Sequence, residues 1–165
     1  MSRAFVKEDD QEEAPFIPPR APLPEGETNY VTPRGKEALQ EEKSDLEQMK
    51  SDAKLIEKEA DRRRTLTTLN GKLKLLEVRI NSARILEPKE QAKNEVRFGA
   101  KVKFEMNGSV QTFQIVGVDE ADVKKEKIAF TSPIAKALIG KKIGEKTDFV
   151  LGKEKWSMEV LGIVY

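Results

Sequence analysis

A short charged stretch in the first half of the chain combines carboxylates with guanidinium groups. Glu57, Glu59 and Asp61 lie close together and are followed at once by the basic triplet 62–64. Exposed, closely spaced carboxylates can hold a divalent cation or orient a water molecule, because both tasks require anionic oxygens. The three arginines could touch phosphates, although they are a weak signal alone. The same residues also suit a solvated helix end, in which Glu59 pairs with Arg63.

The composition removes most other catalytic chemistries. The 165 residues include no cysteine and no histidine, which excludes thiolate nucleophiles, disulfide scaffolds, zinc fingers and imidazole bases. The sequence also lacks a glycine-rich phosphate loop, a dinucleotide fingerprint and a nucleophile elbow. Any chemistry must therefore depend on carboxylates, lysine, serine or threonine, or on a partner.

Charge and hydropathy limit the classes of protein to which this chain can belong. Lys and Arg number 30 and Asp and Glu 29, so the net charge of +1 gives the whole chain no general attraction for nucleic acid or an anionic membrane. With 38% hydrophobic and 36% charged residues, the chain can form one modest core plus a part that is mostly surface. No apolar run is long enough for a signal peptide or a membrane span. We therefore expect a cytoplasmic protein with no membrane partner.

Residues 1–28 form a distinct N-terminal segment. They contain five of the eight prolines and an acidic cluster at residues 8–13. Such a segment cannot bury enough apolar surface to offset the entropy lost on ordering. We expect a disordered tail with polyproline character, in which Phe5, Phe16 and Ile17 could anchor a partner.

Residues 29–88 carry a helical periodicity that begins at a clear start signal. Thr32 can cap the free N–H groups of a first turn, and Pro33 suits the first helical position. Two apolar series follow, with the steps of three and four that are typical of a coiled-coil seam, and polar Glu42 interrupts the first. They comprise Leu39, Leu46, Met49, Ala53, Ile56 and Ala60, then Leu66, Leu69, Leu73, Leu76, Ile80 and Ala83.

The two series are one position out of phase, and the break falls between Ala60 and Leu66. A continuous helix would swing the second series away from the first, so we predict two antiparallel helices joined by a turn. We place this turn near residues 61–65, although Asn70-Gly71 is the better turn dipeptide. Extra apolar residues toward the end of the second helix should meet another hydrophobic surface; they are Leu75, Val78, Ile85 and Leu86.

The pattern of apolar and polar residues changes after Pro88, which should end the second helix. Residues 89–95 read as a polar linker, and beyond them the apolar period becomes two, as in half-buried strands. Asn107-Gly108 is a typical hairpin turn. We expect an α+β protein in which residues 96–165 form about five mostly antiparallel strands around one short helix. The strands are expected at 100–106, 110–118, 127–131, 147–151 and 155–164, and the helix at 133–139.

Several of these stretches resemble one family, the bacterial Gre transcription elongation factors, which rescue backtracked RNA polymerase by stimulating cleavage of the nascent transcript. Ser132-Pro133-Ile134-Ala135-Lys136-Ala137-Leu138-Ile139-Gly140 is similar to the family's C-terminal signature. The resemblance covers about residues 30–165. The other stretches that resemble the family are Phe98-Gly99-Ala100-Lys101-Val102, Ile115-Val116-Gly117-Val118-Asp119-Glu120-Ala121-Asp122, and Thr32-Pro33-Arg34-Gly35 followed by Ala38-Leu39.

The resemblance implies an N-terminal antiparallel coiled coil and a C-terminal FKBP-like domain. It implies that the C-terminal domain docks on the rim of the secondary channel of RNA polymerase, while the coiled coil enters toward the polymerase's own Mg²⁺ and the 3′ end of the nascent RNA. The factor would be a monomer with no cofactor, metal site or enzyme activity of its own. By analogy, the polymerase-binding candidates are Asp119, Glu120, Ser132, Pro133 and Ile134.

The predicted tip departs from the family pattern. Members that promote cleavage carry Asp and then Glu three positions later, whereas residues 57–65 read EKEADRRRT, and the hairpin is also shorter. Either Glu59 and Asp61 replace that pair, or the factor occupies the channel without promoting cleavage and instead pauses, inhibits or competes. Two remoter alternatives are a prolyl isomerase, which needs an aromatic-lined pocket, and a coiled-coil adaptor unrelated to polymerase.

Overall fold

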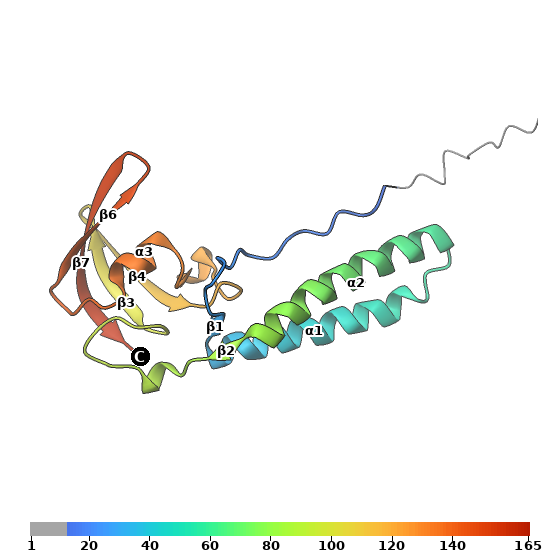
Figure 1. The fold of residues 1–165 in the computed structure, drawn as a ribbon, viewed down its shortest axis with the longest axis horizontal. Coiled ribbons are helices and arrows are strands. Elements are labelled where there is room, and N and C mark those ends of the chain that lie inside the picture. Colours follow the sequence, from blue (N-terminus) through green and yellow to red (C-terminus); the bar gives the residue numbers. More distant parts are fainter. Residues whose placement is uncertain (1–12) are drawn as a thin grey trace, which may run out of the picture.

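The protein consists of a pair of long helices and a five-stranded sheet that meet at one end of the helical pair (Figure 1). The computed structural model describes residues 13–165, and the predicted anchor Phe5 lies outside them. The mixture of helices and sheet agrees with the predicted α+β class. In chain order the elements are β1 (Tyr30–Val31), α1 (Pro33–Ala53), α2 (Glu59–Ser82), β2 (Arg84–Ile85), η2 (Pro88–Glu90), β3 (Lys101–Met106), β4 (Ser109–Val116), η3 (Val123–Lys125), β5 (Lys127–Ala129), α3 (Pro133–Leu138), β6 (Lys146–Leu151) and β7 (Glu154–Val164).

Helices α1 and α2 lie side by side and run in opposite directions (Figure 1). The start of α1 is the predicted one: Thr32 is the N-cap, its Oγ1 accepts from the backbone N–H of Gly35 at 2.9 Å, and Pro33 occupies the first turn. The helices bury a single apolar seam between them, which offsets the entropy of ordering two long helices. Its buried members are Leu39, Leu46, Ala53, Leu69, Leu73 and Leu76.

The connection between the helices lies at residues 54–58, so the predicted turn at 61–65 was wrong. Ala60 belongs to the second helix, although its spacing extends the first apolar series. Glu59 and Asp61 lie in the first turn of α2, where carboxylates interact favourably with the positive end of the helix dipole. This end effect, which apolar periodicity does not report, identifies the helix start.

Most of the extra apolar residues that were expected near the end of the second helix do not meet another surface, and two of them, Ile85 and Leu86, lie beyond the end of α2 at Ser82. Leu75, Val78 and Ile85 are exposed, as is Met49 of α1. The helical pair projects away from the sheet, so only its base can pack against the sheet domain (Figure 1). Leu86 alone fulfils the expectation, since it packs against the core under the sheet.

The sheet has the strand order β5-β4-β3-β7-β6, with β4 and β5 parallel and the other neighbours antiparallel. The predicted turn at Asn107-Gly108 joins β3 and β4, and both residues have positive φ, 51° and 81°, as a two-residue hairpin turn requires. Helix α3 packs on β6 and contributes Ala135 and Leu138 to the core. The fully buried large side chains of this core are Phe104, Ile115, Leu138, Met158, Val96, Val102 and Val160.

Residues 13–28 are extended and include no helix or strand, but they make specific contacts, so the prediction of a disordered tail does not hold for them. A Cβ built on Gly71 of α2 would lie 1.9 Å from Cδ1 of Ile17, which shows how closely Ile17 covers that helix. Arg20 binds two carboxylates of other elements. The tail is ordered by pairing of charges, which its low apolar content did not reveal, whereas Phe16 stays exposed.

A short parallel pair of strands joins the two parts of the molecule. β1 pairs with β2 through the registers Tyr30 to Arg84 and Val31 to Ile85, and this pairing ends α2 at Ser82, before the predicted stop at Pro88. The ring of Tyr30 lies 6.2 Å from that of Phe98 and 5.9 Å from that of Phe130, both in the core under the sheet. The strand that leads into the helices is therefore packed on the sheet domain.

Neither long helix of the described residues 13–165 combines the length and the hydropathy that crossing a bilayer requires.

Gly117 gives a test of the joint between the helices and the sheet domain, which is formed where β1 packs on the sheet domain. A Cβ at Gly117 would lie 2.5 Å from the backbone oxygen of Tyr30, and a backbone atom cannot turn aside as a side chain can. We expect Gly117→Ala to lower the free energy of unfolding by about 2 kcal/mol in urea denaturation. The control is Gly162→Ala, whose new Cβ would meet its nearest neighbour at 3.7 Å. Equal effects of the two variants would show that the approach of Tyr30 to Gly117 does not constrain the joint.

Candidate functional site

Glu120, a predicted polymerase-binding residue, lies against the start of α1. Its Oε2 accepts from the hydroxyl of Thr32 at 2.6 Å, and its Oε1 pairs with Nζ of Lys127 at 3.3 Å. A Cβ at Gly35 would lie 2.7 Å from Oε2, so glycine leaves the room that this carboxylate occupies. The N-terminus of a helix favours an anion, because its free N–H groups and its dipole point toward it. Glu120 thus ties the sheet domain to α1.

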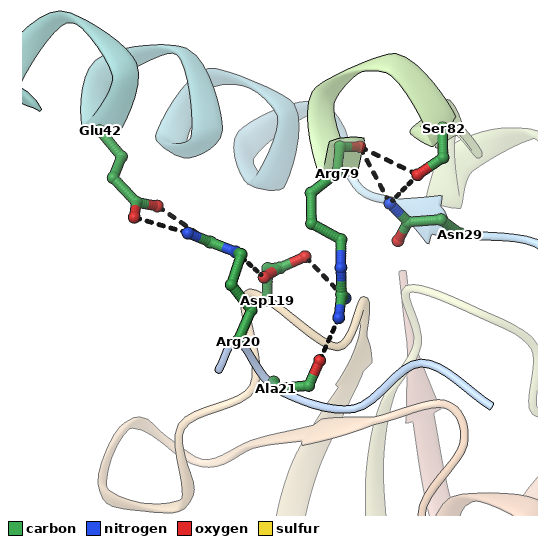
Figure 2. Close-up of polar contacts among 7 residues, drawn as sticks. All are labelled: Arg20, Ala21, Asn29, Glu42, Arg79, Ser82 and Asp119. Carbon is green, nitrogen blue, oxygen red and sulfur yellow. Dashed lines mark hydrogen bonds and ion pairs between the residues drawn. The ribbon is translucent and has the colours of Figure 1, made fainter. Parts of the chain in front are cut away.

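Asp119, the preceding candidate, ties the same loop to α2 and to the tail. Its Oδ1 accepts from Nε of Arg20 at 2.9 Å, and its Oδ2 accepts from Nη1 of Arg79 at 3.2 Å (Figure 2). Only 7% of the Asp119 side chain is exposed. A carboxylate buried to this degree needs charged partners, because removing it from water is costly. Arg79 also donates to the backbone oxygen of Ala21.

Arg20 extends this network to α1. Its two terminal nitrogens bind both oxygens of Glu42, at 2.7 and 3.0 Å, in the fork geometry that makes arginine–carboxylate pairs strong. The hydrogen bond to Glu42 raises the pKa of Arg20 above its ordinary value, and the charge of Asp119 raises it further. Arg20 is therefore positively charged at every physiological pH.

The candidates at the start of α3 have structural roles of their own. Ser132 is the N-cap, and its Oγ accepts from the backbone N–H of Ala135 at 3.2 Å. Ile134 packs partly against the core under the sheet, whereas Pro133 is exposed. Of these three, Pro133 presents the most surface.

The tip of the helical pair has a different character from its base. Glu59 and Asp61 are exposed, and Asp61 pairs with Nζ of Lys58 at 3.9 Å. Residues two apart on a helix point to different sides, so these two carboxylates do not converge on one point. Across residues 13–165, the structure contains no cluster of three acidic side chains suited to a metal ion. Leu55, 81% exposed, is the most exposed of the large apolar side chains at the tip.

Sequence reasoning missed Arg20 and Arg79 as partners of Asp119, and Glu42 as the second partner of Arg20. Only Glu42 left a signal, because it interrupts the first apolar series. A charged residue at such a position indicates a partner from another element, but spacing along the chain does not say which one.

The comparisons with known proteins bear mainly on the sheet domain. Residues 91–165 match the family model described as transcription elongation factor GreA/GreB, C-terminal. The sheet domain is thus similar to the C-terminal domain of the GreA/GreB factors. The predicted resemblance to the Gre factors is thus confirmed.

Relatives that are called transcription elongation factor GreA extend this match. The protein from Thermodesulfovibrio yellowstonii is 35% identical over 99 residues, which are 59% of this chain and 63% of that relative. The protein from Acidiphilium cryptum is 38% identical over 97 residues, 58% of this chain and 62% of the relative. The chain therefore spans less than two thirds of the length of these relatives.

Two solved structures are similar over more of the chain. The elongation factor GreA/GreB from Nitrosomonas europaea has 17% identity and a TM-score of 0.40, covering 82% of this chain and 98% of its own. The Thermus aquaticus protein Gfh1 has 22% identity and a TM-score of 0.39, covering 81% of this chain and 96% of its own.

Thr32 gives a test of the contact between the sheet domain and α1. Thr32→Val keeps the shape of the side chain but removes the hydroxyl that caps α1 and donates to Glu120. We expect a loss of about 1–2 kcal/mol in the free energy of unfolding, measured in urea. The control is Thr67→Val, because the exposed hydroxyl of Thr67 bonds only to the carbonyl of Arg63 in its own helix. If both variants lose the same stability, the contact with Glu120 contributes nothing.

Proposed function

We propose that this protein is a transcription elongation factor that acts with RNA polymerase in the manner of the Gre factors. The observation that carries the proposal is a GreA/GreB C-terminal domain fixed to the base of a long helical pair. The helices have 21 and 24 residues, so they project roughly 32 to 36 Å at 1.5 Å per residue. A slender projection of this length suits a narrow channel.

In this proposal, the C-terminal domain is FKBP-like and docks on the rim of the polymerase's secondary channel, and the helical pair enters the channel as a coiled coil. The docking surface is formed by the loop that contains Asp119 and Glu120 together with the start of α3. The side chains of Asp119 and Glu120 are 7% and 10% exposed, so in the free protein Pro133 offers more of this surface than they do. Ser132 and Ile134 hold Pro133 in place.

The geometry of the tip favours a factor that occupies the channel without stimulating transcript cleavage. Two carboxylates must point to the same place to help to hold the polymerase's Mg²⁺. Glu59 and Asp61 lie two positions apart on a helix and diverge, and Asp61 already has a cationic neighbour. The tip would therefore lie near the 3′ end of the RNA and affect elongation by its presence. The alternative, in which Glu59 and Asp61 do support cleavage, is an outcome of the test below.

The protein would have no active site or cofactor of its own, since the only metal in this account is the polymerase's Mg²⁺. It would work as a monomer in the cytoplasm, where its polymerase is found. A prolyl isomerase is less favoured, because the aromatic side chains of the sheet domain pack in its core and against one another, among them Phe104, Phe113, Phe130, Phe149 and Trp156.

Single-turnover RNA cleavage in a backtracked elongation complex of the cognate polymerase tests this function. At fixed Mg²⁺, we expect the protein to bind the complex but leave the cleavage rate within about twofold of the intrinsic rate, a difference of less than about 0.5 kcal/mol in the barrier. The variant with Glu59→Ala and Asp61→Ala should behave in the same way.

The matched control carries Asp45→Ala and Glu47→Ala, which remove the same charge from exposed positions of α1. Faster cleavage that is lost in the tip variant and kept in this control would show that Glu59 and Asp61 act at the polymerase's metal. Absence of binding to any polymerase complex would overturn the proposed function itself.

A further inference from the structure

The N-terminal segment 13–21, here called the strap, crosses from the helices to the loop of Asp119. Ile17 lies on Gly71 of α2, and Arg20 bridges Glu42 of α1 and Asp119 of the sheet domain. Figure 2 shows Arg20 between the two carboxylates, with Arg79 on the far side of Asp119. The strap thus covers Asp119, whose loop contributes to the proposed docking surface.

The strap is attached in a way that allows its release. Its residues form no helix or strand, so few backbone hydrogen bonds would break. The fork geometry favours the Arg20–Glu42 pair, but the side chain of Glu42 is 42% exposed, and access of water reduces the stability that such a pair contributes. A cleft of about 370 Å³ also remains beside the strap, lined in part by Pro18, Leu75 and Val118. Incomplete packing of this kind weakens the attachment further.

Release of the strap would not unfold the joint. Asp119 would keep Arg79, and Glu120 would keep Thr32 and Lys127. The change would uncover carboxylate oxygens of Glu42 and Asp119 beside each other at the base of the helices. An acidic surface of this kind fits a partner surface that carries guanidinium or ammonium groups.

We propose that the strap is an internal competitor, in which Arg20 occupies the acidic surface of Glu42 and Asp119 in the free protein and gives it up to a basic surface of the polymerase. This inference rests on the proposed function, because the polymerase is the partner. It adds a regulatory role for the N-terminal segment: the factor docks weakly while the strap is bound and tightly once it is released.

The experiment uses one releasing variant and one locking variant of the full chain. Arg20→Ala removes the bridge, and its control is Arg34→Ala, which removes an exposed arginine that pairs only with Glu37 and Glu41 of the same helix. Ile17→Cys with Gly71→Cys locks the strap, since a Cβ at Gly71 would lie 2.9 Å from Cγ1 of Ile17, where the sulfur of Cys at position 17 would lie, close to the separation between a Cβ and the far sulfur of a disulfide. The natural chain has no cysteine, so this would be its only disulfide, and reduction provides the matched control.

The first measurement is made on the free protein. Spin labels on cysteines introduced at Ala14 and Lys74, both exposed, report the distance between the strap and α2. We expect a narrow distance distribution in the wild type and in Arg34→Ala, and a broad one in Arg20→Ala. An unchanged distribution in Arg20→Ala would overturn the inference, whatever the polymerase does.

The second measurement is the Kd for the polymerase elongation complex. We expect Arg20→Ala to bind about tenfold more tightly than the wild type, equivalent to about 1.4 kcal/mol, and the oxidised cysteine variant to bind more weakly than its reduced form. Equal affinities for all forms would overturn the competition and leave the proposed function standing. Absence of binding by every form would overturn both, while the distances in the free protein would still report whether Arg20 holds the strap.

Discussion

The burial of two adjacent carboxylates at the base of the helices determines how the molecule is assembled. Glu120 turns toward the N-terminus of α1, and Asp119 turns toward Arg79 near the end of α2. Each would lose its hydration without compensation if its partner moved away, and an unpaired buried charge is far more costly than a broken surface pair. The sheet domain is therefore tied to both helices at once, and rotation about either tie strains the other.

A joint of this kind matters because the helices are long. At a length of roughly 35 Å, a tilt of about 5° at the base moves the tip by about 3 Å, which is the length of a hydrogen bond. The tie at Gly35 removes such freedom, since the carboxylate of Glu120 occupies the space that a Cβ would take. The close approach of Gly117 to the backbone of Tyr30 acts in the same direction. Two glycines thus let the two parts approach closely enough to fix an angle.

Local signals in the sequence predicted the elements well. The cap at Thr32, the turn at Asn107-Gly108 and the period of two after residue 96 all correspond to observed structure, because each depends on neighbours in the chain. The turn between the helices was misplaced, since apolar spacing continues across a helix end. The network around Asp119 could not be predicted from local signals, because Arg20 lies 99 residues from Asp119 in the sequence. Composition alone made the tail look disordered.

The base and the tip are under different physical constraints. Asp119 and Glu120 are buried and paired, so a change at either position costs stability before it affects any partner. Glu59, Asp61 and Leu55 are exposed, and the end of the helical pair at which α1 is connected to α2 lies far from the sheet (Figure 1). These three residues can therefore be replaced at little cost to the fold. A chain with this architecture can change the charges at its tip and still direct that tip as before. Divergence at the tip is thus compatible with an intact base, because it changes the groups that the tip presents without changing where the base places them.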